Sequence, residues 1–296
     1  EKITLKMKKL FFFIILSVCA TASNAQLLWK ISDNGLKESS YIFGTHHVAP
    51  LCICDSIKGF EKAFTECKQL YGEIKIDSTS NEKTQLLVSK YIMLPQDSLL
   101  NTLYSPEEYR ILSSIIKKYL NADIEQLNMF KPSFISTQLS VQQSAKVFNK
   151  FDPEIQLDGS LQKKAEKLGK QVYGLETIEF QMQTVLGGSI DEQAEELIKI
   201  AKEEELFVDH IKEMADKYMQ QDINALLNLM SDPKLGNTEK ELDKFIFSRN
   251  RNWAELLKNI LPKKSTFIVV GAGHLPGEEG LINLLRNQGY TVEPVN

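Results

Sequence analysis

Two short strings of the same form stand near the two ends of the sequence. Gly44–His47 (GTHH) follows the apolar run Tyr41–Phe43, and Gly271–His274 (GAGH) follows Thr266–Val270. Three of the four histidines of the chain lie in these two Gly-x-x-His turns. A histidine just past a strand, where a glycine lets the backbone turn sharply, lies at the sheet edge where α/β proteins usually build their sites. We therefore expect the two turns to converge on one site.

Two histidines and a carboxylate form a common minimal ligand set for a hydrolytic metal centre. His47 and His274 supply the imidazoles, and Glu73 supplies the carboxylate because its predicted strand, Gln69–Ile76, is expected to pair beside the first histidine strand. A metal ion there lowers the pKa of bound water and polarises a carbonyl group. No contiguous motif such as His-Glu-x-x-His is present, so structural, hydrogen-bonded histidines are the alternative interpretation.

The other polar candidates have weaker signals. Arg249 could bind a substrate carboxylate or stabilise an oxyanion, or it could be a surface residue of an amphipathic helix. Glu176 could orient a histidine N–H, start a helix or form a salt bridge. Tyr218 could donate to an oxyanion, although a core role is favoured. We expect His46 to be a turn residue, with a ligand role as the alternative, and His210 to be a surface histidine.

Each histidine turn stands in a strand–turn–helix–strand sequence, which predicts two right-handed βαβ units. In the first, a hairpin signal at Asp33–Gly35 joins two strands, and helical spacing covers Asp55–Cys67. In the second, a helix through Leu281–Leu285 stops at Gly289 and a last strand covers Tyr290–Val295. The chain between these units is mostly helical. One helix is predicted to start after a capping box at Ser105 and to end at about Leu120, and another is capped by Asp158 and ends near Gly169. A short strand is predicted at Gln171–Gly174. The other predicted helices cover Phe130–Lys146, Asp191–Met219, Asp222–Met230 and Glu239–Ile260.

These elements predict an α/β (α+β) fold of two pseudo-symmetric halves around a central sheet, with a large helical middle insertion. We expect a leader with a signal peptide over residues 1–25 and one domain over 26–296. That domain would consist of an N-terminal half at about 26–98, a helical middle at about 99–260 and a C-terminal βαβ unit at 261–296. The stretch from Leu99 to Met230 is expected to form the walls that face the substrate.

The first 25 residues have the form of a secretory signal peptide. Met7–Lys9 is basic, Leu10–Ala22 is apolar, and Ser23–Ala25 offers a cleavage site of small residues. The apolar run is short for a bilayer span, and Cys19 lacks the small preceding residue that a lipid anchor needs. We therefore expect a periplasmic or extracellular protein without a stable membrane anchor.

The net charge limits which classes of partner the protein could bind, and the cysteines leave several roles open. Residues 1–25 hold four of the 35 basic residues and one of the 39 acidic residues, which leaves 31 against 38, a net charge of about −7. No dense basic patch remains, so nucleic acid is a poor candidate partner and a peptide or small molecule is the expected one. Cys52, Cys54 and Cys67 leave three interpretations open: a disulfide from Cys67 to Cys52 or Cys54, free buried thiols, or metal ligation.

Several strings resemble the TraB/PrgY/GumN family, over about Leu27 to Val295. They are YIFGTHH ending at His47, GLET at Gly174–Thr177 followed by Gln181, an Arg-Asn pair ahead of Trp253, and VGAGHLPG from Val270 followed by Gly280-Leu281. The C-terminal string is the most specific of these. The family pattern places the Arg-Asn pair three residues ahead of the tryptophan, which favours Arg249-Asn250 over Arg251-Asn252.

The resemblance implies an active site made of the paired Gly-x-x-His histidines, His47 and His274, together with Glu73. The family includes the TIKI proteases, so it implies a metal-dependent peptidase or related hydrolase that uses a divalent ion such as Mn, Co or Zn. A wider kinship implies an erythromycin-esterase-like or ChaN-like architecture. Two alternatives remain: a metal-free, esterase-like hydrolase with a histidine general base and Glu73 moving the proton, or a protein that sequesters a peptide or small molecule.

Overall fold

Six strands form one mixed sheet in the computed structural model, which describes residues 26–76, 82–148, 156–235 and 238–295. The predicted signal peptide lies outside the described residues. The strands are β1 (Leu28–Ser32), β2 (Ser40–Thr45), β3 (Gln69–Gly72), β4 (Gln171–Gly174), β5 (Thr266–Gly271) and β6 (Thr291–Pro294). Their order across the sheet is β4-β3-β5-β2-β1-β6. β4, β3, β5 and β2 run parallel, whereas β1 is antiparallel to both of its neighbours. The α/β (α+β) prediction is therefore confirmed.

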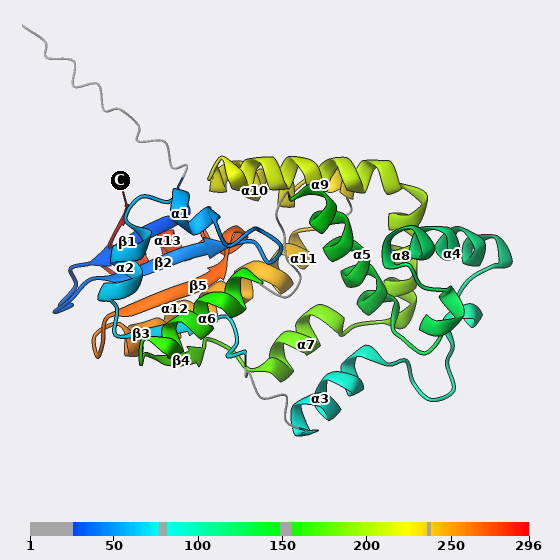
Figure 1. The fold of residues 1–296 in the computed structure, drawn as a ribbon, viewed down its shortest axis with the longest axis horizontal. Coiled ribbons are helices and arrows are strands. Elements are labelled where there is room, and N and C mark those ends of the chain that lie inside the picture. Colours follow the sequence, from blue (N-terminus) through cyan, green and yellow to red (C-terminus); the bar gives the residue numbers. More distant parts are fainter. Residues whose placement is uncertain (1–25, 77–81, 149–155, 236–237, 296) are drawn as a thin grey trace, which may run out of the picture.

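Helices cover both faces of this sheet and continue beyond its carboxyl edge (Figure 1). They are α1 (Ile53–Ser56), α2 (Phe60–Glu66), α3 (Glu82–Ile92), α4 (Pro106–Leu120), α5 (Pro132–Val147), α6 (Leu157–Lys167), α7 (Ile178–Leu186), α8 (Ile190–Lys202), α9 (Glu204–Met219), α10 (Ile223–Met230), α11 (Glu239–Leu242), α12 (Ser248–Ile260) and α13 (Leu281–Asn287). α2 and α6 lie on one face, while α12 and α13 pack together on the other. α3 to α5 and α7 to α9 form a separate helical region beside the sheet.

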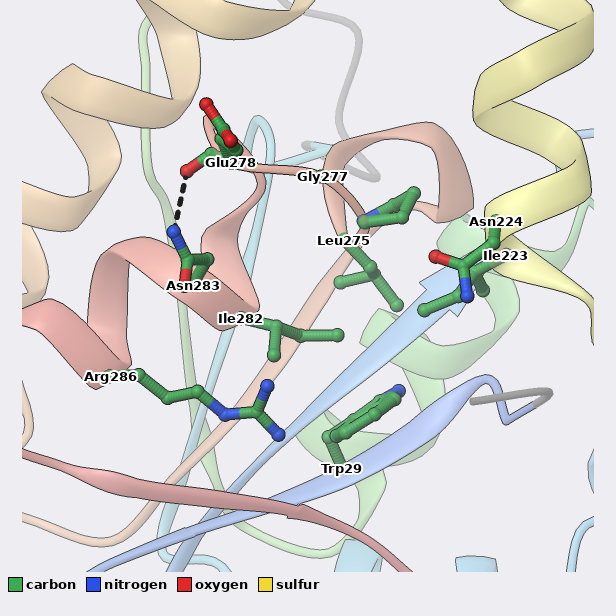
Figure 2. Close-up of a pocket in the computed structure, with 10 residues that line it drawn as sticks. Trp29, Ile223, Asn224, Leu275, Gly277, Glu278, Ile282, Asn283 and Arg286 are labelled. Carbon is green, nitrogen blue, oxygen red and sulfur yellow. Dashed lines mark hydrogen bonds between the residues drawn. The ribbon is translucent and has the colours of Figure 1, made fainter. Parts of the chain in front are cut away.

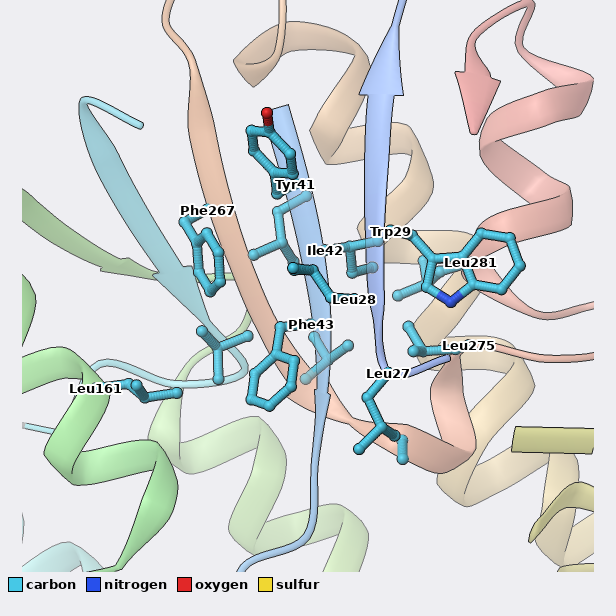
Figure 3. Close-up of a cluster of buried hydrophobic side chains, with 14 of the residues drawn as sticks. Leu27, Leu28, Trp29, Tyr41, Ile42, Phe43, Leu161, Phe267, Leu275 and Leu281 are labelled. Atoms are coloured by element: carbon cyan, nitrogen blue, oxygen red, sulfur yellow. The ribbon is translucent and has the colours of Figure 1, made fainter. Parts of the chain in front are cut away.

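Aromatic side chains hold the two halves of the chain together at the centre of the sheet (Figure 3). Phe43 of β2 lies 4.9 Å from Phe60 of α2, and Phe267 of β5 lies 5.0 Å from Phe64 of the same helix, measured between ring centroids. All four rings are buried. Burial of such side chains is the main favourable contribution to folding, so strands from opposite ends of the sequence share one core.

The helical region has a hydrophobic cluster of its own. Its centre consists of fully buried side chains from α4, α5 and α8, namely Leu112, Ile116, Leu139 and Leu197. The capping box predicted at Ser105 is present: its hydroxyl accepts from the Glu108 N–H, and the Glu108 carboxylate accepts from the Ser105 N–H. Among the described residues, no helix is both long and apolar enough to cross a lipid bilayer.

Three predicted elements are shorter than the sequence suggested. The helix predicted over Asp55–Cys67 is divided at Gly59, whose φ of +76° interrupts the helical conformation. The stretch Asp191–Met219 is divided at Glu203 into α8 and α9. The strand predicted to reach Ile76 ends at Gly72, the last residue paired with both β4 and β5.

The expected position of Glu73 was also wrong in one respect. β3 does not pair with β2, because β5 lies between them. Glu73 therefore follows a strand that neighbours the second histidine strand, not the first. Strands adjacent in sequence often lie adjacent in space, but here the C-terminal strand enters the centre of the sheet and separates the two N-terminal strands.

Candidate active site

Four parallel strands each deliver a polar side chain to the same edge of the sheet. His47 follows β2, Glu73 follows β3, Glu176 follows β4 and His274 follows β5, each within three residues of the strand's last residue. Because the carboxyl ends of parallel strands lie along one edge, residues far apart in sequence come together there. This is the edge that faces the helical region (Figure 1).

Gly44, the first residue of the first Gly-x-x-His turn, packs against Ala272 of the second turn and against Leu275, which follows that turn. A Cβ atom on Gly44 would lie 2.8 Å from Cδ1 of Leu275 and 2.9 Å from Cα of Ala272. Real Cβ atoms do not approach backbone so closely, so only glycine allows this packing. The prediction that the two turns converge therefore agrees with the structure.

Glu73 is the buried anion at the centre of the site. Its Oε1 accepts a hydrogen bond from the Gly271 N–H at 2.8 Å, and its Oε2 accepts from Arg249 Nη2 at 2.6 Å and from Gln181 Nε2 at 3.0 Å. Nε2 of His274 lies 3.7 Å from Oε1. Glu73 thus connects β3, β5, α7 and α12 around one carboxylate.

The surroundings of Glu73 keep it ionised. Burial alone would raise the pKa of this carboxyl group. The charge of His274, which is protonated only at low pH, and the charges of Arg249 and His47, together with the Gly271 N–H, outweigh burial. The resulting pKa is about 2. At neutral pH the carboxylate is therefore available only as an acceptor or a ligand, and it is not a proton donor.

Arg249 is 5% exposed, and each of its five N–H groups has an acceptor within the protein. Nε and one N–H of Nη2 donate to the two oxygens of Glu176, at 3.0 and 2.7 Å. The other N–H of Nη2 donates to Glu73, while Nη1 donates to the Phe245 carbonyl at 3.0 Å and to His274 Nε2 at 3.2 Å. To bind a substrate carboxylate or oxyanion, as the sequence suggested, Arg249 would have to give up one of these partners.

Of the two Arg-Asn pairs in this stretch, Arg249-Asn250 faces the site. Arg251 instead pairs with Asp243 and Glu279 at the surface, where 46% of its side chain is exposed. Glu176 forms its ion pair with Arg249 and no hydrogen bond with either histidine. It therefore does not orient a histidine N–H, which was one of its three predicted roles; Asp158 and Asn250 bind the histidines instead. Burial raises the pKa of Glu176, although Arg249 opposes this shift.

The hydrogen bonds of His274 determine where its ring proton lies. A guanidinium N–H can only donate, so His274 Nε2 must accept from Arg249 and carry no proton. Nδ1, 2.7 Å from Asn250 Oδ1, then donates to that oxygen. The Asn250 amide nitrogen is a donor in turn, to the carbonyls of His274 and Glu279 at 3.2 and 2.8 Å. His274 therefore presents the lone pair of Nε2 to the cluster around Glu73.

Burial keeps this ring neutral. Burial, helped by the positive charges of Arg249 and His47, lowers the pKa of His274 to about 4, against the opposing charge of Glu73. The ring also packs 4.6 Å from Trp253, and the Arg249 guanidinium lies 4.6 Å from the centre of the same indole. Trp253 thus fixes the positions of both neighbours.

Replacing Asn250 with alanine is expected to lower the free energy of unfolding by about 1–3 kcal/mol, because buried partners on His274 and Glu279 lose their hydrogen bonds. Urea denaturation measures the change. The exposed neighbour Asn252 provides the matched control, and its alanine variant should stay within about 0.5 kcal/mol of the wild type. Equal effects of the two substitutions would contradict the anchoring role of Asn250.

His47 is anchored from a different direction. Its Nδ1 lies 3.1 Å from Asp158 Oδ2, while Oδ1 of the same carboxylate accepts from the Thr45 hydroxyl at 2.8 Å. The charge of Asp158 and its hydrogen bond raise the pKa of His47. About 70% of the His47 side chain is exposed, so water screens the ion pair and we expect it to contribute little to stability. The ring is instead held in one orientation while its other edge stays accessible.

Asp158 was predicted to cap a helix, and this prediction is wrong. α6 begins at Leu157, its N-cap residue is Gln156, and Asp158 lies in the first turn. A carboxylate in this turn interacts favourably with the helix dipole. Here it is also turned toward the first histidine turn, more than one hundred residues away in sequence.

The other two histidines lie outside this cluster. The ring of His46 packs 4.8 Å from Phe148 and 5.5 Å from Tyr218, and burial lowers its pKa to about 4. Tyr218 is fully buried and donates to the Gly44 carbonyl at 3.2 Å, which agrees with the favoured core role. His210 is partly exposed on α9.

The donor chemistry of the site suits a divalent metal, although the ligands are not gathered around one point. Both histidines are anchored through Nδ1 to an oxygen, a common arrangement of metal-binding imidazoles. However, within the described residues His47 forms no hydrogen bond or ion pair with Glu73 or His274, although its charge acts on both. No group of three or more His, Cys, Asp or Glu side chains there is arranged to hold a metal ion. The Arg249 guanidinium already contacts both Glu73 and His274.

The cysteines do not contribute to the site. Cys52, Cys54 and Cys67 are all free thiols in the structure, so the disulfide and metal interpretations are not supported. Cys54 and Cys67 are buried, and burial raises the pKa of each thiol to about 12. Both therefore remain protonated and act as small apolar side chains.

Two hollows flank the histidine turns. One, of about 310 Å³, lies beyond the second turn and is lined by Trp29, Leu275, Gly277 and Arg286 (Figure 2), but no residue of the polar cluster reaches it. The other, of about 340 Å³, is lined by His46 and His47 together with residues of α5, α7 and α8. Of these two hollows, only the second is lined by a histidine of the candidate site, His47, and the helical middle supplies most of its other lining residues.

The fold and the site together define a class of mixed α/β protein in which two Gly-x-x-His turns enclose a buried Glu–Arg–His cluster. A family model described as the TraB/PrgY/gumN family matches residues 27–294. The chain therefore belongs to the TraB/PrgY/gumN family, and the resemblance noted in its sequence is confirmed.

Curated relatives are named as metalloproteases. Metalloprotease TIKI2 of Danio rerio is 23% identical to this chain, and Metalloprotease TIKI1 of Xenopus tropicalis is 24% identical. Each match covers 90% of this chain and 60% of the relative, so the chain spans about 60% of their length. No solved structure matches the chain significantly.

Proposed function

We propose that this protein is a metal-dependent hydrolase that cleaves a peptide bond, and that it acts in the periplasm or outside the cell. The main support is the matched anchoring of two histidines from two converging turns. Asp158 holds Nδ1 of His47, and Asn250 holds Nδ1 of His274. In each ring Nε2 is the remaining position for a ligand bond, and in His274 a ligand would have to displace the N–H of Arg249. The names of the TIKI relatives support the same class of reaction.

In this proposal His47, His274 and Glu73 would hold the ion, and the metal would supply a Lewis acid that lowers the pKa of water. The protein's own residues prepare that set. Glu73 stays ionised down to a pH of about 2, and His274 keeps its Nε2 unprotonated at neutral pH. Arg249 fixes the Glu73 carboxylate, so it is a positioning residue.

A metal-free hydrolase is the second candidate, and the Arg249–His274 contact favours it. Nη1 of Arg249 already occupies the Nε2 lone pair of His274, at 3.2 Å. In such an enzyme His47, held by Asp158 and open to the hollow, would exchange the proton with the substrate. Among the described residues Glu73 forms no hydrogen bond with His47, although the charge of His47 acts on it, so Glu73 would not relay that proton directly.

Metal content and activity of the purified protein distinguish these candidates. We expect about one divalent ion per chain in the wild type and a large loss of metal in His47→Ala, with His210→Ala unchanged. Chelation should abolish peptide cleavage, and manganese, cobalt or zinc should restore it. Normal turnover by chelated, metal-free protein would support the second candidate. Peptide binding without any cleavage would point instead to a sequestering protein.

A further inference from the structure

His47 and Glu73 follow strands that are not neighbours in the sheet. β5 lies between β2 and β3, so no hydrogen-bonded ladder joins the two strands directly. Helix α6 contacts both sides of this gap. It packs against β3 and β4 (Figure 1), and Asp158 in its first turn accepts a hydrogen bond from the Thr45 hydroxyl at the end of β2, at 2.8 Å. One helix therefore reaches both ends of the site.

Gln162, one turn further along α6, binds the segment that begins at Glu73. Its side chain is 3% exposed. Nε2 donates to the Ile74 carbonyl and Oε1 accepts from the Ile76 N–H, both at 2.9 Å. Among the described residues, these two backbone groups have no other hydrogen-bond partner. Gln162 therefore supplies the hydrogen bonds that the strand ladder no longer provides after Gly72.

The amide of Gln162 fits closely against the end of β3. A Cβ atom on Gly72 would lie 2.6 Å from Nε2 of Gln162, so the glycine before Glu73 leaves the space that this amide occupies. Residues four apart lie on one face of a helix, so Asp158 and Gln162 share a face of α6. The helix itself is fixed by side chains buried in the main core, namely Leu157, Leu161 and Ala165.

We propose that α6 sets the separation of His47 and Glu73, with Gln162 as a positioning residue for Glu73. Asp158 holds the His47 ring from one turn of the helix, and Gln162 holds the backbone after Glu73 from the next. A shift of that backbone would move the Glu73 carboxylate away from the Gly271 N–H, which lies 2.8 Å from Oε1. This inference rests on the proposed hydrolase and adds a residue on which its geometry depends.

Gln162→Met removes both hydrogen bonds at nearly constant side-chain length. Amide hydrogen exchange of the full chain, followed by NMR, should become about 10-fold faster at Gly271, with which Gln162 forms no hydrogen bond. The Gly44 N–H, bound to the Leu27 carbonyl, should keep its wild-type rate. Peptide cleavage should lose about 10- to 100-fold in kcat with little change in KM. Gln156→Met, an exposed substitution at the start of the same helix, should change neither exchange nor cleavage.

A second variant, Gln162→Glu, separates positioning from packing. A protonated carboxyl group can accept from the Ile76 N–H and donate to the Ile74 carbonyl, as glutamine does, whereas a carboxylate can only accept. Burial raises the pKa of an introduced carboxyl group, so Gln162→Glu should match the wild type at about pH 5 and behave like Gln162→Met at about pH 8. Comparison with the wild type at each pH removes the titrations that both proteins share. This variant decides the question alone if Gln162→Met does not fold.

The outcomes separate the position of Glu73 from the reaction. Wild-type exchange at Gly271 in a folded Gln162→Met variant, or a rate in Gln162→Glu that keeps the same ratio to wild type at both pH values, overturns the positioning role even if peptides are cut. Faster exchange with a wild-type kcat overturns it as well. Faster exchange that acid reverses, in a protein that cuts no peptide, supports the positioning role and counts against the proposed hydrolase.

Discussion

Exchange of Arg249 for methionine is expected to lower the free energy of unfolding by about 3–5 kcal/mol. The substitution leaves Glu73 and Glu176 as buried carboxylates without a cation, and removal of one partner of a buried ion pair carries a cost of this size. Arg251→Met is the matched control, because Arg251 makes its two ion pairs at the surface, and its loss should cost less than about 1 kcal/mol. Urea denaturation of both variants measures the difference.

The same substitution should reverse the pH dependence of stability. In the wild type the pKa of Glu73 is lowered to about 2, so its contribution is present above the unfolded value of about 4.3 and is lost as the pH falls toward 2. Without Arg249, burial should raise the pKa of Glu73 above the unfolded value. The variant would then lose stability as the pH rises from 5 to 8. A variant equally stable at both pH values, or destabilised no more than Arg251→Met, would show that the cluster does not need its cation.

Replacing His274 with glutamine is expected to lower kcat/KM for peptide cleavage by about 10²–10⁴-fold, the range typical for loss of a positioned catalytic group. Glutamine fills a similar volume beside Trp253 but offers no imidazole lone pair. The loss should appear mainly in kcat, because His274 is 4% exposed and lines neither of the two hollows beside the histidine turns. In the metal-dependent case, the variant should also retain less metal than the wild type.

Initial rates on one peptide, with the thermal midpoint measured on the same samples, test this expectation. His210→Gln is the control, because His210 lies on α9 away from the cluster, and its rates should match the wild type. A folded His274→Gln variant that keeps most of its activity would remove His274 from the reaction. The reaction would then have to depend on His47 and Asp158 alone.

The sequence predicted those parts of the site that follow local rules. A glycine, a histidine and a preceding β-rich run are enough to place His47 and His274 at strand ends, and the alternation around Leu70 places Glu73 in the adjoining segment. The hairpin at Asp33–Gly35 was predictable for the same reason: all three residues have positive φ values, from 47° to 79°, which Asp, Asn and Gly adopt most readily.

The remaining parts depend on contacts between distant elements. Asp158 looked like a helix cap because Asp is common there, and only the docking of α6 against β3 and β4 turns it toward His47. Asn250 was noted only as the neighbour of Arg249, yet it sets the proton position of His274. Gln181 appeared in the family strings without a role, and its bond to Glu73 arises from the position of α7. The order of strands was missed because nothing local indicates that β5 inserts between β3 and β2.

The position of β5 between β3 and β2 has a consequence for the synthesis of the protein. Ser40 and Thr266 are joined by a hydrogen bond that spans 226 positions, and β2 has no parallel neighbour until β5 has emerged from the ribosome. A nascent chain that stops short of residue 266 lacks His274, the Gly271 N–H that binds Glu73, and Phe267 of the aromatic core. Such long-range pairing slows folding. An incomplete chain also cannot assemble the cluster of Glu73, Arg249 and His274, so this cluster forms only after the C-terminal strand has been synthesised.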